Sequence, residues 1–159
     1  MNLPDLSVFR EDVRGMDAYA VPDATGLIKL DAMENPYTLP PELAQALGER
    51  LATVALNRYP PSDPKPLKIK LAARMGVPSC SSLLLGNGSD ELIHLLIQAC
   101  AKPGAAVLAP WPSFVMYETS ARLNGCRFIG VPLRDDFSLD AEAMLATIQS
   151  ARPAVTFIA

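Results

Sequence analysis

The chain has 159 residues, of which 50% are hydrophobic and 19% charged, and it has a net charge of -3 and an isoelectric point near 5.1. This composition is typical of a globular α/β protein with a sizeable core and leaves little room for long disorder. Lys and Arg are scattered rather than clustered, and no apolar run reaches the roughly 18 residues of a membrane span, so neither nucleic acid nor a membrane is expected as a partner.

The three cysteines, Cys80, Cys100 and Cys126, are odd in number and widely spaced. This pattern indicates neither a disulfide framework nor a paired metal-ligand motif, and a reducing cytoplasm fits it best. The N-terminus lacks a basic start followed by an apolar core. We therefore expect a cytoplasmic protein with no export signal and no metal site.

Residues 1–38 are predicted to form an N-terminal arm. They are rich in proline and acidic residues, and only the short stretch Leu27–Leu30 resembles a strand. Because so few apolar residues cannot form a separate core, the arm is expected to lie against the body of the protein or against a second subunit.

Two helices are predicted after the arm. The first begins at residues 40–41, a pair of prolines, and places apolar side chains on one face: Leu43, Ala44, Leu47, Leu51 and Val54. Residues 59–66 contain too many prolines for a helix or a central strand and are predicted to be a loop. The second helix covers residues 67–75, and Gly76 and Pro78 end it.

From residue 82 onward, predicted strands and helices alternate. The strands are expected at residues 83–85, 106–109, 127–131 and 154–158, and the helices at residues 90–100, 114–123 and 140–149. This alternation predicts βα units and a mainly parallel sheet covered by helices. The last predicted strand is apolar with no turn after it, and ligands bind beyond the carboxyl ends of parallel strands. We therefore expect the chain to be the first part of a longer protein.

The most informative segment is a glycine-containing turn between the predicted strand at 83–85 and the following helix. Gly86 and Gly88 let the backbone turn sharply and approach a ligand, and the free amides and dipole of a helix start favour a phosphate. Ser89 adds a hydroxyl donor. The alternative is that Gly88 or Ser89 simply caps the helix, with Asp90 and Glu91 favourable in its first turn.

A second candidate segment, residues 109–117, follows a strand and opens a helix that bears Phe114 and Tyr117. An aromatic ring at such a position can stack on a planar cofactor, and the alternative is packing in the core or at an interface. His94, the sole histidine, has no catalytic or metal partner at a suitable spacing and is expected to be structural or solvent-facing. The segment Arg134–Asp136 is predicted to be a solvated turn.

Four segments together resemble the histidinol-phosphate aminotransferases, a family of fold-type-I enzymes that depend on pyridoxal phosphate. They occur in the order and approximate spacing of that family: Glu34-Asn35-Pro36, Arg58-Tyr59-Pro60, Gly86-Asn87-Gly88-Ser89-Asp90-Glu91 and Pro110-x-Pro-Ser-Phe114-x-x-Tyr117. The similarity runs from about residue 28 to the last residue. It implies that residues 39–159 begin the large cofactor-binding domain, with the rest of that domain and a small C-terminal domain to follow.

The resemblance also assigns roles to individual residues. It implies that the turn formed by Gly88, Ser89 and Asp90 binds the phosphate of pyridoxal 5'-phosphate, and that Phe114 stacks on the pyridine ring, where the family often has tyrosine. Tyr59 is expected to reach the cofactor phosphate of the neighbouring subunit in a homodimer with shared active sites.

On the substrate side, the resemblance implies that Asn35 lies close to the amino substrate. The family commonly has the segment Asn-Glu-Asn-Pro, and this chain has Met33 in place of the first Asn. Any contact that the first Asn makes in the family is therefore in doubt for this chain. No catalytic residue is assigned, because the lysine that forms a Schiff base with the cofactor is expected downstream. None of the upstream lysines lies in a matching context: Lys29, Lys65, Lys68, Lys70 and Lys102.

The function implied by the resemblance is transamination between histidinol phosphate and 2-oxoglutarate by the intact protein. Family members that act on aromatic amino acids or decarboxylate threonine phosphate share the same N-terminal motifs, so these activities stay open. A non-catalytic phosphate-binding α/β module and a structural remnant that only dimerises or folds with a partner are the alternatives from other classes.

Overall fold

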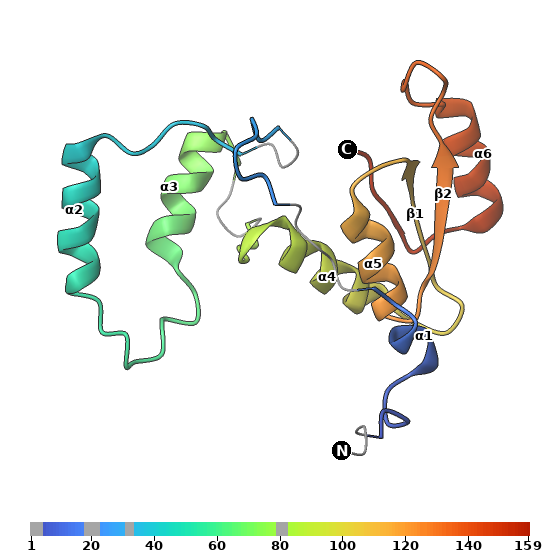
Figure 1. Ribbon diagram of the computed structural model, residues 1–159, viewed down its shortest axis with the longest axis horizontal. Helices are drawn as coiled ribbons and strands as arrows, with labels where there is room; N and C mark the ends of the chain where they lie inside the picture. The colour runs from blue at the N-terminus through green and yellow to red at the C-terminus, as the bar shows by residue number, and fades with distance from the viewer. Residues whose placement is uncertain (1–4, 18–22, 31–33, 79–82) are drawn as a thin grey trace. The chain divides into compact units, whose positions relative to one another are not determined.

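A computed structural model describes residues 5–17, 23–30, 34–78 and 83–159 (Figure 1). The chain divides into two compact units. The first combines residues 1–17 with residues 84–159, and the second covers residues 18–83.

A three-stranded parallel sheet forms the centre of the first unit. Its strands are β1 (Ala106–Trp111), β2 (Arg127–Pro132) and β3 (Val155–Thr156), arranged in the order β2-β1-β3. Ala106 pairs with Arg127 on one side of β1, and Leu108 pairs with Thr156 on the other. The strand that comes first in the sequence is therefore the central one.

Helices cover both faces of this sheet (Figure 1). The helices α4 (Gly88–Cys100) and α5 (Val115–Leu123) pack on one face, and α6 (Ala141–Ala151) packs on the other. The predicted α/β fold with a parallel sheet between helices is confirmed for this part of the chain.

The alternating directions of the side chains along β1 explain why helices must cover both faces of the sheet. Val107 and Ala109 point into a cluster with the buried side chains of α4 and α5: Ile93, Ile97, Tyr117 and Ala121. Leu108, which has no exposed surface, points the other way and packs against Val131 and Met144. Because successive side chains of a strand face opposite sides, a strand that is apolar throughout must be buried on both.

The first part of the predicted arm contains a short helix, α1 (Glu11–Arg14), that sequence patterns did not predict. The Arg10 guanidinium next to it donates to the carbonyl oxygens of Arg122 (3.0 Å) and Leu123 (2.9 Å) at the end of α5. A cation is favourable at the carboxyl end of a helix, where the last carbonyl groups lack partners. Its hydrogen bonds to Asp12 lower the pKa of that carboxyl, so the ion pair persists until the pH falls through this lowered pKa.

The second unit contains the two helices predicted after the arm, α2 (Pro41–Ala52) and α3 (Lys65–Met75). Both have proline in the first turn, where a missing amide costs no hydrogen bond. Gly76 ends α3 with φ 69°, the left-handed conformation that glycine adopts without strain. Within α3, Lys68 forms an ion pair at 3.0 Å with Asp63, which precedes the helix.

Two predicted strands are wrong. Residues 83–85 and 27–30 form no strand, because neither segment has a neighbouring strand among the described residues with which to form a ladder. The backbone amide of Leu27 instead donates to the carbonyl of Ala24 (2.9 Å) in a turn, and Ile28 is 88% exposed. The predicted strand at residues 154–158 is present but is reduced to β3. Apolar composition alone therefore does not produce a strand.

Truncating the centre of the sheet should destabilise the first unit. Leu108→Ala removes a fully buried side chain between β2 and α6, and we expect a loss of about 2 to 5 kcal/mol. Urea denaturation measures this loss. The control Leu145→Ala removes a leucine of α6 that is 59% exposed, and it should change stability by less than about 0.5 kcal/mol. Equal effects of the two variants would contradict the assigned core.

Removing the guanidinium should release the N-terminal helix from α5. Arg10→Ala removes the hydrogen bonds that join this segment to the carbonyl oxygens of Arg122 and Leu123, so the amides of α1 should exchange with deuterium faster than in the parent protein. The control Arg14→Ala changes an arginine of the same helix and leaves both hydrogen bonds intact. If exchange in α1 is the same in Arg10→Ala and the parent, the contact does not fix this segment.

Candidate functional site

The start of α4 forms a turn whose backbone conformation needs glycine. Gly88, the first residue of the helix, has φ +81°, and a Cβ added there would meet no atom within 4 Å. The requirement at this position is therefore conformational rather than steric, since side chains other than glycine are strained at such a φ. The open space above Gly88 leaves the backbone approachable from outside.

Gly86, two residues earlier, is needed for close packing. A Cβ there would lie 2.8 Å from Oε2 of Glu91 and 3.0 Å from Cγ of Leu92. The Glu91 carboxylate turns back over Gly86 and accepts a hydrogen bond from the amide of Asn87. This contact holds the Glu91 carboxylate against the amide of Asn87 and away from the amides that follow Asn87.

Ser89 and Asp90 present free donors at the helix start. Their backbone amides donate to no acceptor among the described residues, as is usual in the first turn of a helix. The Ser89 hydroxyl is 3.5 Å from Oδ1 of Asp90, at the limit of a hydrogen bond, and is available to another acceptor. Asn87 occupies the N-cap position without a side-chain cap. Two amides, a hydroxyl and the helix dipole together suit an anion.

Phe114 lies where β1 has ended and α5 begins. It occupies the N-cap position of α5 and is 43% exposed. Its ring meets Tyr117 edge-on, with ring centroids 5.6 Å apart and planes at 85°. Phe114 is therefore only partly packed, and the remaining ring surface is open to a planar ligand. Its position follows the rule that ligands of parallel α/β sheets bind beyond the carboxyl ends of the strands.

The structure places the two halves of the predicted cofactor site in the same unit. The turn at Gly88, Ser89 and Asp90 lies at the start of α4, and Phe114 lies at the start of α5. These two helices share one core cluster that includes Ile93 and Tyr117. No contact between the turn and Phe114 is found among the described residues.

Tyr59 and Asn35 belong to the second unit. The Tyr59 side chain is fully exposed. Oδ1 of Asn35 accepts from the amide of Tyr37 at 3.0 Å, which fixes this side chain in a local turn and leaves its NH2 group for a ligand. Met33 and Cys80 lie outside the described residues.

Several other residues have structural roles. Nδ1 of His94 lies 3.4 Å from the side-chain amide of Asn124, which confirms the structural interpretation of the histidine. The turn at Arg134–Asp136 is also confirmed, because the Phe137 amide donates to the carbonyl of Arg134 (2.8 Å). The described residues include no cluster of three or more potential metal ligands and no helix long and apolar enough to cross a membrane.

The sequence interpretation missed one component near the candidate site, a stack of Tyr117 on Phe157. The two ring centroids are 4.4 Å apart and their planes differ by 5°. The spacing of Phe114 and Tyr117 in the sequence indicates that these two rings can share a helix turn. Nothing in the sequence indicates that Phe157, which follows the distant strand β3, would join them.

The chain is similar to known proteins of one family. The family model for class I and II aminotransferases matches residues 25–159. Histidinol-phosphate aminotransferase 1 of Burkholderia lata is 60% identical over 152 residues, covering 96% of this chain and 43% of that protein. The histidinol-phosphate aminotransferase of Acidovorax sp. (strain JS42) is 59% identical over 157 residues, covering 99% of this chain and 43% of that protein. The chain thus spans less than half of the length of these curated relatives.

A solved structure shows the same fold. The chain superposes on histidinol-phosphate aminotransferase from Sinorhizobium meliloti in complex with pyridoxal-5'-phosphate with a TM-score of 0.79 and 20% sequence identity, covering 97% of this chain and 42% of that one. This likeness identifies the α/β layers as part of a fold-type-I domain. Together with the match of the family model over residues 25–159, it shows that the chain belongs to the class I and II aminotransferase family.

Proposed function

We propose that the intact protein is a pyridoxal-phosphate-dependent aminotransferase that moves an amino group between histidinol phosphate and 2-oxoglutarate, as a step of histidine biosynthesis. Curated relatives with 60% and 59% identity to the chain bear the name histidinol-phosphate aminotransferase. The observation that supports the cofactor most directly is the turn at Gly88, Ser89 and Asp90, whose free donors suit a phosphate.

The residues present fit the cofactor in two respects. The first is the donor set at the start of α4, in which Ser89 offers an amide and a hydroxyl and Asp90 offers its amide, with its carboxylate Oδ1 3.5 Å from that hydroxyl. The second is the exposed part of the Phe114 ring. When bound, pyridoxal phosphate acts as an electron sink and accepts the amino group. This chain's own residues would bind its phosphate and orient its ring.

The proposal includes a homodimer with shared active sites and a cytoplasmic location. A fully exposed Tyr59 with no described partner supports a role at a neighbouring subunit. Asn35, with its oxygen held by the Tyr37 amide, is proposed to present its NH2 group to the amino substrate. The free thiols of Cys100 and Cys126 are compatible with a reducing compartment.

The experiment that tests the proposed function combines cofactor binding with turnover. The intact protein, purified with pyridoxal phosphate, should be yellow, and borohydride should fix the cofactor to a lysine. With histidinol phosphate and 2-oxoglutarate, it should form glutamate and the corresponding keto product. A protein that fixes no cofactor would refute the assignment, and one that fixes it but makes no glutamate from histidinol phosphate would refute the substrate.

Ser89→Ala should weaken cofactor retention. The variant loses one hydroxyl donor to the phosphate, which corresponds to about 1 kcal/mol, or roughly a fivefold higher dissociation constant. Equilibrium dialysis of the intact protein measures this change. The control is Ser150→Ala, which removes an exposed serine of α6 whose hydroxyl bonds only within its own helix (3.3 Å to Thr147). Equal retention in the two variants would show that Ser89 does not bind the phosphate.

A mixed dimer distinguishes a shared site from an internal one. One subunit carries Tyr59→Ala, and the other carries Gly88→Asp, which adds a carboxylate to the anion-binding turn. If Tyr59 serves the neighbouring subunit, both defects fall on one site and the other site is intact, so the dimer should bind one cofactor with the parent affinity. If two sites of reduced affinity are titrated instead, Tyr59 acts within its own chain and the shared-site proposal fails.

A further inference from the structure

Three aromatic rings form a continuous group at the carboxyl ends of β1 and β3. Phe114 follows β1, Tyr117 lies one turn later on α5, and Phe157 directly follows β3. Phe114 meets Tyr117 edge-on at 5.6 Å, and Tyr117 lies parallel to Phe157 at 4.4 Å. The three rings come from two segments of the first unit that are far apart in the sequence, and they meet at the edge of the sheet where the cofactor is proposed to bind.

Tyr117 is the fixed member of this group. Its side chain is 8% exposed and packs in the same cluster as Ile93 and Ala121. Phe157 closes the other side of its ring and is itself anchored, because its backbone amide donates to the carbonyl of Leu108 at 2.9 Å. The tyrosine hydroxyl makes no hydrogen bond to any described residue, so the contribution of Tyr117 comes from its ring.

Phe114, in contrast, depends on Tyr117 for its orientation. It is 43% exposed and occupies the N-cap position, where the helix does not yet restrict its side chain. Without an aromatic neighbour, an exposed phenylalanine populates several staggered rotamers. A ring that must first be ordered binds a planar ligand less tightly than one that is already held in place.

We propose that Tyr117 is a positioning residue for the cofactor. Its ring holds Phe114 in the orientation that stacks on the pyridine ring, and Phe157 holds Tyr117. The inference rests on the proposed function, since it requires that Phe114 contacts the cofactor. It adds to that function a residue that does not itself touch the cofactor and whose effect passes entirely through Phe114.

The test compares cofactor affinity in four variants of the intact protein. Tyr117→Leu removes the ring and should raise the dissociation constant of pyridoxal phosphate by about two- to tenfold, the range of one aromatic contact. Tyr117→Phe keeps the ring and should bind like the parent. Adding Tyr117→Leu to Phe114→Leu should have no further effect, because the two residues act as one unit. Independent effects of the two substitutions would overturn the proposal.

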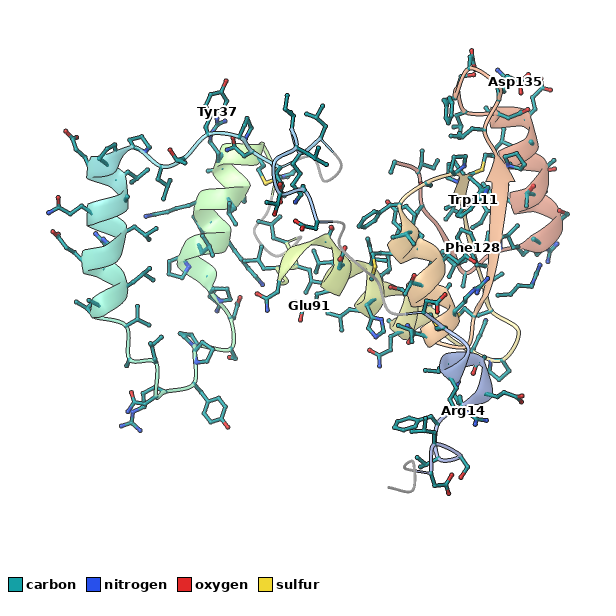
Figure 2. All side chains as sticks on the ribbon, viewed as in Figure 1. Arg14, Tyr37, Glu91, Trp111, Phe128 and Asp135 are labelled. Atoms are coloured by element: carbon teal, nitrogen blue, oxygen red, sulfur yellow. The ribbon has the colours of Figure 1, made fainter. Side chains whose placement is uncertain are left out.

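A spectroscopic readout and a matched control separate positioning from general destabilisation. The induced circular dichroism of the bound cofactor reports ring orientation, and it should decrease in Tyr117→Leu and return in Tyr117→Phe. Phe128→Leu is the control, because Phe128 packs against the same buried cluster as Tyr117 but its ring has its edge contact with Trp111, at 6.4 Å (Figure 2). This control should lose comparable stability with an unchanged cofactor signal. An equal loss of signal in Phe128→Leu would overturn the proposal.

Phe157→Leu provides a second route if Tyr117→Leu does not fold. It leaves Tyr117 in the core and removes its stacking partner, so the cofactor signal should decrease through Tyr117 and Phe114. An unchanged signal would overturn the proposal. If Phe114→Leu binds pyridoxal phosphate like the parent, the assignment of Phe114 fails. If Phe114→Leu weakens binding and Tyr117→Leu does not, only the positioning role fails.

Discussion

The burial of β1 on both faces is the constraint on which the first unit depends. A strand whose side chains point alternately to two apolar layers is stable only when helices cover both sides of the sheet. Val107 and Ala109 require α4 and α5, and Leu108 requires α6. The parallel pairing of β1 with β2 and β3 follows, since each crossover returns the chain through one of these helices to the same end of the sheet.

The candidate site is a consequence of that arrangement. Since all three strands run in the same direction, the segments that follow them meet at one edge, where Phe114 and Phe157 lie. Packing of α4 against the same core as α5 fixes the helix whose first turn holds Ser89. The chemical groups that would bind a ligand are therefore positioned by residues that never approach it.

The sequence was sufficient where local chemistry decides the structure. The end of α3 at Gly76 follows from a left-handed glycine, and the helices on the sheet follow from apolar periodicity. The glycine turn at the start of α4 could also be predicted, because glycines and a helix start are local features. The Glu91 contact with the Asn87 amide was not predicted, although the residue itself was noted as favourable there.

The sequence was insufficient where contacts join distant segments. The apolar run at residues 83–85 has the composition of a strand, yet pairing depends on a neighbour that composition does not reveal. The hydrogen bonds of Arg10 to the end of α5 and the stack of Tyr117 on Phe157 each join residues far apart in the chain. Long-range contacts of this kind are specified by the whole fold rather than by any short pattern.

The central place of the first strand also sets an order of assembly. Pairing of β1 with β2 closes a shorter loop than pairing of β1 with β3, so it costs less chain entropy and is favoured to form first. Until β3 arrives, the other side of β1 presents unpaired amides and carbonyl groups, which are a template for association with other chains. A strand as short as Val155–Thr156 therefore has a protective role as well as a structural one.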